Sequence, residues 1–203
     1  IVRTADDTCA LRAFIKTTNI AQGVPMKKRI HLAFIATMLA ISTSSYAGTA
    51  ALGFELGVST AEQVKADLTK FTNLEEPDVS GLTGGVYLKT DDSGYGIDGL
   101  NTVTYIFDKN NVLGAILINM TKNRFNAIYD AVSRKYKLET AQRPFVGDQF
   151  ARFKASDAVI EIDAPHLSFE MDVSYIRNDI KEMSLKQAAE NKRKKKKRKE
   201  ESF

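Results

Sequence analysis

The order of apolar and polar residues from Phe54 onward predicts alternating helices and strands. Ser59 and Glu62 have the spacing of a capping box, in which the side chain of each residue accepts from the backbone N–H of the other. The next apolar positions have helical spacing and predict a first helix over about 60–72: Ala61, Val64, Leu68 and Phe71. After a loop rich in Gly, β-branched and aromatic residues predict three strands: 86–89, 102–107 and 112–118. The last strand is nearly all apolar, which is typical of a central strand covered on both faces.

The second half of the domain begins with the clearest amphipathic stripe. Thr121 or Asn123 caps a predicted helix with five residues on its apolar face: Phe125, Ile128, Tyr129, Val132 and Tyr136. After Pro144, three more strands are predicted: about 148–154, 158–163 and 167–175. The last strand alternates strictly and should point five residues inward: Leu167, Phe169, Met171, Val173 and Tyr175. A final helix from about 176 runs into a lysine-rich tract.

These patterns predict one α+β domain over 48–185. Each half, 60–118 and 122–175, has a helix followed by about three strands. We therefore expect two helices on one face of a single antiparallel sheet. A C-terminal helix and a basic tail over 186–203 complete the expected fold.

A leader-like segment precedes this domain. The first methionine, Met26, is followed by three basic residues, a short apolar core over 32–41 and a small-residue cleavage site that ends at Ala47. The apolar core is about half as long as a bilayer-spanning helix requires. We therefore predict a signal peptide over 26–47 and a periplasmic or secreted bacterial protein. Residues 1–25 are expected to lie upstream of the true start, outside the mature chain.

The cysteine content of the mature chain excludes several kinds of site, and its charge is unevenly distributed. The only cysteine, Cys9, lies upstream of Gly48, so a chain from Gly48 would have no disulfide, no thiolate metal site and no lipoprotein cysteine. Of 29 Lys and Arg, six precede Gly48 and eight form one tract near the C-terminus, which leaves 15. The same region, 48–191, has 21 Asp and Glu. An acidic body therefore carries a basic tail.

The ten residues 55–64, ELGVSTAEQV, resemble the Gly-x-(Ser/Thr)-x-x-Glu-Val opening of small exported helix-plus-three-strand modules. Outer-membrane-assembly lipoproteins of the SmpA/OmlA type and tandem modules of the β-lactamase-inhibitor type are similar in this opening. The resemblance implies a binding module without catalysis, and it implies no site residues. The lipoprotein cysteine of the first family is absent here.

One histidine, His166, lies in the mature chain, between Asp163 and Ser168 in the sequence. Ser, His and Asp are the residue types of a nucleophilic triad, but there is no G-x-S-x-G elbow and no glycine-built oxyanion loop. We expect a turn histidine bonded to backbone. A hydrolase using His166 remains an alternative.

Two other motifs contain residue types that occur in ligand sites. One loop offers oxygen ligands for calcium at four positions: Asp91, Asp92, Ser93 and Asp98. Their spacing departs from the EF-hand pattern, so a solvated loop is expected. The glycines of 94–99 spell G-x-G-x-x-G, but a predicted strand follows them where a dinucleotide site needs a helix. One histidine and no cysteine do not make a usual zinc set, and no cofactor is predicted.

Four carboxylates should face outward on neighbouring strands: Glu161, Asp163, Glu170 and Asp172. Glycoside hydrolysis needs two carboxyl groups across a cleft, one of them with a raised pKa. An open sheet face offers neither burial nor a cleft. We expect a solvated acidic face, partly balanced by Arg152 and Lys154, with a docking surface for a basic partner as the alternative.

Eight consecutive basic residues form the tract near the C-terminus: Lys192, Arg193, Lys194, Lys195, Lys196, Lys197, Arg198 and Lys199. No aromatic residues interleave with them to stack on bases, so nucleic acid is not the expected partner. Anionic lipid or an envelope polymer is expected, and a disordered tail without a partner is the alternative. We expect 192–203 to be exposed, and helical only against an anionic surface.

These patterns favour an exported, non-enzymatic binding or accessory module whose ligand the sequence does not identify. A protein partner is compatible with this prediction, and no transmembrane span is expected in the mature chain. The first alternative is an envelope-attached protein held electrostatically by its Lys-rich tail. The second is the hydrolase.

Overall fold

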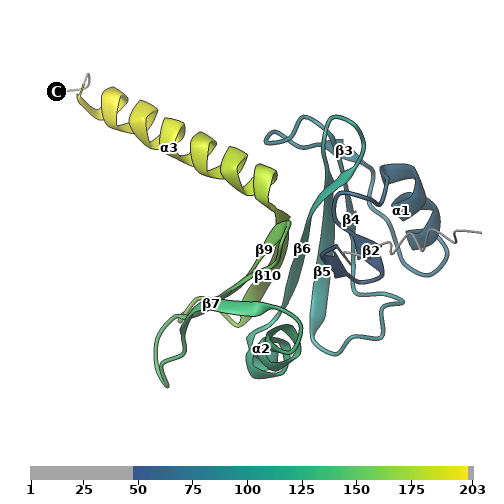
Figure 1. Ribbon diagram of the computed structural model, residues 1–203, viewed down its shortest axis with the longest axis horizontal. Helices are drawn as coiled ribbons and strands as arrows, with labels where there is room; N and C mark the ends of the chain where they lie inside the picture. Colours follow the sequence, from purple (N-terminus) through teal and green to yellow (C-terminus); the bar gives the residue numbers. More distant parts are fainter. Residues whose placement is uncertain (1–47, 201–203) are drawn as a thin grey trace, which may run out of the picture. The chain divides into compact units, whose positions relative to one another are not determined.

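The structure is a computed structural model that describes residues 48–200 (Figure 1). Over these residues it has an eight-stranded antiparallel sheet of order β3-β4-β5-β6-β10-β9-β8-β7, a separate two-stranded hairpin and three α-helices. The prediction of a mixed α+β fold with a C-terminal helix is confirmed. The predicted signal peptide over 26–47 and the upstream segment 1–25 lie outside the described residues.

The strands of the large sheet are β3 (Asp78–Val79), β4 (Val86–Thr90), β5 (Leu100–Phe107), β6 (Leu113–Thr121), β7 (Lys137–Gln142), β8 (Gln149–Lys154), β9 (Ala158–Ala164) and β10 (Glu170–Arg177). The hairpin pairs β1 (Ala50–Ala51) with β2 (Phe54–Glu55). The helices are α1 (Ala61–Leu68), α2 (Phe125–Ser133), which follows the short 3₁₀ turn Lys122–Arg124, and α3 (Asn178–Glu200).

Strand register aligns one row of apolar side chains across the large sheet. From β4 to β8 the successive partners are Leu88, Tyr105, Ile116, Tyr175, Ile160 and Phe153. Opposite residues of an antiparallel pair project on the same side, so this row defines one face. The hairpin and α2 pack on this face, since the Phe54 and Tyr105 rings lie 5.4 Å apart and the Tyr129 and Phe153 rings 5.5 Å apart.

The capping box of α1 lies one residue later than the sequence predicts. Thr60, rather than Ser59, is the N-cap: its hydroxyl accepts from the Gln63 N–H, and the Gln63 side chain accepts from the Thr60 N–H. The predicted partner Glu62 has no part in this cap. The helix ends at Leu68, short of the predicted end, and it buries its apolar residues in the same core as the sheet row.

Two residues predicted to point inward do not. β10 begins at Glu170, so Leu167 and Phe169 lie in the preceding turn with 92% and 93% of their surface exposed. The apolar alternation continues past the end of the sheet, where no layer remains to cover it. The inward prediction is wrong for these two residues and is confirmed for Met171 and Val173, which are buried.

Two further strands differ from the sequence prediction. β7 was not predicted, because it is an edge strand exposed along its whole length and has no apolar alternation to reveal it. β6 is central, as predicted, but it is buried on both faces only from Leu113 to Ile116, and Leu117 is exposed.

The first turn of α3 packs on the opposite face of the sheet. Ile180 is buried against Gly114, where an added Cβ would lie only 2.9 Å from the Ile180 Cγ1 atom. Glycine at this position therefore permits the close approach of α3. The Lys181 ammonium holds Glu161, on that face, at 2.7 Å.

The rest of α3 has little contact with the sheet. From Leu185 to Arg198 every residue is exposed, and the helix continues to Glu200. The expectation that the basic tract is helical only against an anionic surface is not met. The good helix propensity of its Lys and Arg residues supports a helix without such a surface, aided by the Lys196–Glu200 pair at 3.7 Å.

A charged junction fixes the start of α3. The Arg177 guanidinium donates to Asp108, in the β5–β6 turn, at 2.9 Å and to Asp179 at 2.6 Å. Burial acts to raise the pKa of Asp108, but the hydrogen bonds from Arg177 and from two backbone N–H groups outweigh it and lower that pKa. The pKa of Asp179 is also lowered, chiefly by its hydrogen bond with Arg177.

A matched pair of Phe→Ala substitutions tests whether Phe153 lies in the buried row and Phe169 in the exposed turn before β10. Phe153→Ala should lower the free energy of unfolding by about 3–5 kcal/mol, because Phe153 is fully buried in the row. Phe169→Ala should change it by no more than about 0.5 kcal/mol. Urea unfolding measures both, and equal costs would contradict the placement of β10.

The junction predicts a dependence of stability on pH. Arg177→Met should lower the unfolding free energy at pH 7 by about 1–3 kcal/mol, because it leaves the carboxylates of Asp108 and Asp179 without their cationic partner. In the wild type, the stabilisation from Asp108 and Asp179 is present above their ordinary pKa of 3.8 and is lost as pH falls through the lower folded pKa.

The variant should therefore show a shallower loss of stability below pH 4 than the wild type. Lys70→Met is the control, because the Lys70–Asp67 pair is exposed and should be worth less than about 1 kcal/mol. Parallel acid-unfolding curves for wild type and Arg177→Met would show that the junction does not contribute.

Candidate functional site

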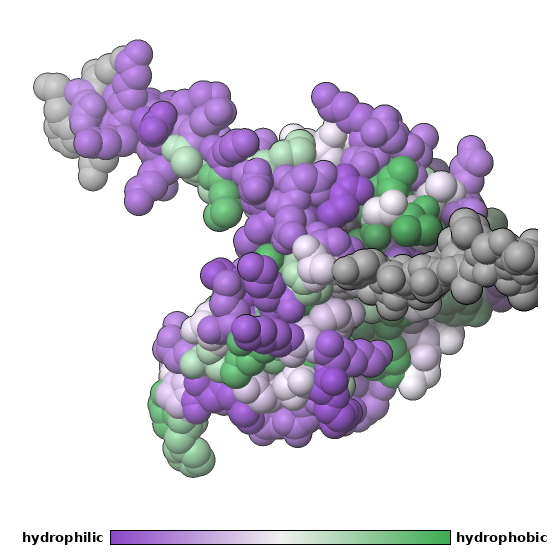
Figure 2. All heavy atoms as spheres, viewed as in Figure 1, coloured by the Kyte–Doolittle hydropathy of each residue, from purple (hydrophilic) through white to green (hydrophobic). Residues whose placement is uncertain are grey.

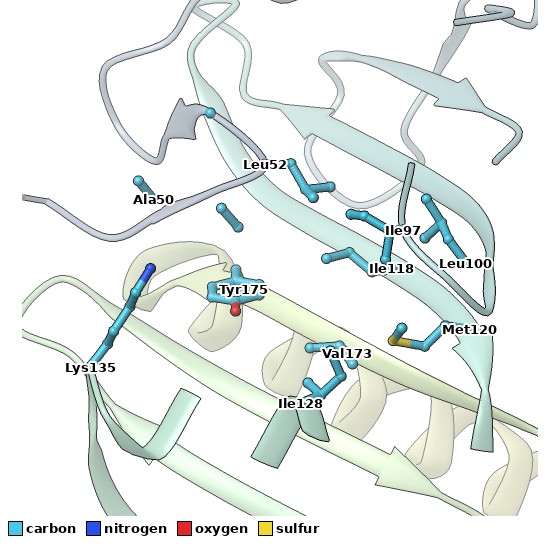
Figure 3. Close-up of a pocket in the computed structure, with 12 residues that line it drawn as sticks. Ala50, Leu52, Ile97, Leu100, Ile118, Met120, Ile128, Lys135, Val173 and Tyr175 are labelled. Atoms are coloured by element: carbon cyan, nitrogen blue, oxygen red, sulfur yellow. The ribbon is translucent and has the colours of Figure 1, made fainter. Parts of the chain in front are cut away.

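An open pocket of about 350 Å³ lies on the sheet face that carries the hairpin and α2 (Figure 3). Its floor is made by the two central strands, with Ile118 and Met120 from β6 and Val173 and Tyr175 from β10. Ile118 and Val173 are direct partners in the β6–β10 ladder, so the pocket lies over the seam between these strands. Its volume falls at the lower end of the range for small-molecule sites.

The hairpin turn supplies one wall of the pocket. Leu52 and Gly53 form a two-residue turn with φ of 52° and 86°, the combination of a type I′ hairpin turn. A leucine in the left-handed region costs about 1–2 kcal/mol, since its Cβ crowds the backbone. The Leu52 side chain lines the pocket together with Ala50 and Ala51, and this burial offsets part of that cost.

The remaining walls come from a loop and from α2. Ile97 and Leu100 close one side, at the start of β5. Ile128 of α2 and Lys135, just beyond its end, close the other. The pocket is thus apolar except at two side chains, Lys135 and Tyr175.

These two polar groups have no partner in the described chain. Neither the Lys135 ammonium nor the Tyr175 hydroxyl has a hydrogen-bond or ion-pair partner within residues 48–200. Burial, followed by the neighbouring Tyr136, raises the pKa of Tyr175 to about 12, so its hydroxyl keeps its proton at neutral pH. Both groups can therefore donate to a ligand.

The structure places His166 outside this pocket, in the exposed turn before β10. Its backbone N–H donates to Asp148 at 2.7 Å, and its carbonyl accepts from Lys122. Within the described chain its imidazole has no hydrogen bond to Asp163 or Ser168, so no triad geometry is assembled.

The four outward carboxylates have different surroundings. Glu161 is held by Arg152 at 2.8 Å and by Lys181 at 2.7 Å, so it is part of an ion-pair network. The pKa of Asp163 is raised, first by burial and then by Asp172, its partner across the β9–β10 ladder. Glu170 is exposed beside the turn.

The predicted oxygen-ligand loop is organised by internal hydrogen bonds. Asp91 accepts from Asn73 at 2.9 Å and from the Ser93 N–H at 2.9 Å, and the Asn73 bond is the largest cause of its lowered pKa. Across residues 48–200, no three His, Cys, Asp or Glu side chains gather as a metal site. The glycines of 94–99 lead into β5, so no helix begins there.

A second apolar feature lies at the end of the sheet where β10 begins. Four large apolar side chains in two loops are exposed: Phe145, Val146, Leu167 and Phe169. The Asp148–His166 hydrogen bond joins these loops, which we call the apolar loop tips. Figure 2 shows hydrophobic side chains at the tip of the β7–β8 loop. The basic residues Lys192–Lys199 lie instead on α3, beyond the other end of β10.

Comparison with protein-family models, with curated proteins and with solved structures finds no match for this chain. The resemblance of residues 55–64 to exported modules therefore stays a prediction. Among the described helices, none combines the length and apolarity that a membrane crossing requires.

Sequence reasoning missed the pocket. Ile118, Val173 and Ile128 were predicted as ordinary core residues, and nothing in their spacing distinguishes a pocket floor from a covered core. The positive φ of Leu52, which is unusual for a bulky residue, is seen only in the structure, because Leu-Gly is not a typical type I′ turn sequence.

Proposed function

We propose that this protein is an exported binding module that holds an apolar ligand in the pocket over the β6–β10 seam. The observation that carries the proposal is the pocket itself: an open, mostly apolar cavity with two unpartnered donors. Apolar cavities with a few placed polar groups are the usual form of small-molecule sites. The leader-like pattern over 26–47 supports export.

We also propose that the domain is built from two halves, and this arrangement explains why the pocket exists. One half of the domain, α1 with β4–β6, and the other, α2 with β8–β10, each cover their own part of the sheet. The helices pack toward the outer strands, and the pocket remains over the seam between the halves. The site is thus a property of how two similar halves meet.

A non-catalytic role agrees with the chemistry around the pocket. Among the described residues, its lining has no carboxylate, histidine, serine or threonine, so neither Lys135 nor Tyr175 has a lining side chain beside it to act as its base. The hydrolase using His166 stays an alternative outside the pocket.

A pocket-filling substitution tests the binding function. Ala51→Phe places a ring at the pocket wall and should weaken binding of N-phenyl-1-naphthylamine, a neutral apolar fluorescent probe, by about tenfold or more. Fluorescence titration measures the affinity. Ala127→Phe, on an exposed position of α2, is the matched control and should bind like the wild type.

His166→Gln should also bind the probe like the wild type, since His166 lies outside the pocket. Thermal unfolding of each variant shows that it is folded. Undiminished binding by folded Ala51→Phe would contradict the proposed site.

Envelope attachment is a second candidate function, and two observations favour it. The first is α3, whose basic residues from Lys192 to Arg198 are exposed. The second is the apolar loop tips, since large exposed apolar groups mark contact with lipid or a partner. A polybasic segment together with apolar insertion anchors more firmly than either alone.

Vesicle co-sedimentation of the mature protein separates the two contributions. Replacing all eight basic residues of 192–199 by Gln should reduce binding to anionic vesicles at low salt to the level seen on neutral vesicles. Wild-type binding through them should weaken steeply toward 0.15 M salt, where the Debye length is about 8 Å. A Phe145→Ser, Leu167→Ser, Phe169→Ser variant should weaken binding to neutral and anionic vesicles alike.

If wild type and the Gln variant bind equally, or if binding through the tract does not depend on salt, then α3 does not attach the protein to membranes. Equal binding by the loop variant would remove the apolar loop tips.

A further inference from the structure

We propose that the ligand of the pocket is a single-chain amphiphile with an anionic head group, bound at Lys135 and Tyr175. This inference rests on the proposed function and names the chemical class of its ligand. It follows from the charge of the pocket, from the way its polar and apolar parts are separated, and from its size.

The polar and apolar linings lie at different ends of the pocket. Figure 3 shows Lys135 at one side, with its nitrogen directed toward Ala50 and with Tyr175 next along the floor. Leu100 and Met120 lie at the other side. A ligand that satisfies both ends must be polar at one end and apolar along the rest of its length.

The polar end selects an anion. Lys135 is the single charged residue among the described residues that line the pocket, and the Tyr175 hydroxyl stays protonated at neutral pH. The carboxylate of Asp157 lies near the hairpin but is already bound by Thr49, at 2.6 Å through its hydroxyl and 3.2 Å through its N–H. A carboxylate or phosphate head would receive two hydrogen bonds, one of them from a cation.

The apolar end selects a flexible chain. The cavity of about 350 Å³ is lined there by aliphatic side chains and a methionine, which accommodate an alkyl chain without demanding a fixed shape. Each methylene buried in such a site should tighten binding about fourfold. Among the described lining residues, no polar side chain lies at that end, so a polar chain would be disfavoured.

Displacement of the neutral naphthylamine probe tests this ligand class. The competitors are dodecanoate, dodecyl phosphate, dodecan-1-ol and dodecyltrimethylammonium, each below its micelle concentration. We expect at least one of the two anions to bind about tenfold more tightly than the alcohol, and the cation more weakly than the alcohol. Comparing the two anions distinguishes a fatty acid from a phosphate-headed lipid. Octanoate should bind far more weakly than dodecanoate.

Substitutions assign the head-group site. Lys135→Met should remove the preference for the anion over the alcohol, and Tyr175→Phe should reduce it, while Lys135→Arg should retain it. Lys137→Met is the matched control, because Lys137 is exposed on β7 and does not line the pocket. It should keep the wild-type preference.

The results separate failure of this inference from failure of the proposed function. If the probe binds but the alcohol competes as well as both anions, or if Lys135→Met keeps the anion preference, the amphiphile assignment is overturned and the binding module stands. If neither the probe nor any competitor binds, both are overturned.

Discussion

The antiparallel pairing of β6 with β10 joins β3–β6 to β10–β7 in one sheet. Seven residue pairs, from Glu170–Thr121 to Ile176–Ala115, form this ladder. Because the register decides which residues of β10 project to each side, a slip of β10 by one residue would move Val173 and Tyr175 to the face opposite Ile118. The core row, the pocket floor and the polar end of the pocket would then be lost together.

The pocket is a consequence of how the layers cover this sheet. α1 and the hairpin stabilise one side of the face, through contacts such as Phe54 with Tyr105, and α2 stabilises the other through Tyr129 with Phe153. Between them the pocket lies over the central strands, where Ile118 and Val173 keep only 9% and 2% of their surface exposed. An unfilled apolar cavity loses packing contacts, and a ligand that fills it would stabilise the fold.

The opposite face is used differently. There α3 begins against Gly114 and is fixed by Arg177 and by the Lys181–Glu161 pair. These contacts hold only its first turns, and the helix is exposed from Leu185 to Arg198. Ligand binding and any electrostatic attachment would therefore act at separate places.

The sequence predicted what depends on local periodicity and missed what depends on tertiary packing. The face of α2 and the inward positions Met171 and Val173 were correctly predicted, because each covered residue repeats at the period of its element. Leu167 and Phe169 continue the same alternation, and only the position of the sheet end shows that nothing covers them. β7 could not be found, because a solvated edge strand needs no apolar residues.

The pocket was invisible for a related reason. Its floor residues are apolar and regularly spaced, like any core residue, and a gap between helices leaves no mark on spacing. Lys135 reads as an ordinary cation at the end of a helix, and Tyr175 as an inward residue of a strand. The β6–β10 register and the length of α2 place Lys135 and Tyr175 at the same end of the cavity. Both are properties of the folded chain.

Methyl NMR spectra recorded while dodecanoate is added test the central claim, that the pocket over the β6–β10 seam is a ligand site. The account predicts saturable shifts of the Leu52, Ile118 and Ile128 methyl resonances with one common affinity, and little change at Leu68 in α1 or Leu185 in α3. Shifts centred on Leu167 at the apolar loop tips, or no saturable shift at the pocket methyls, would contradict it.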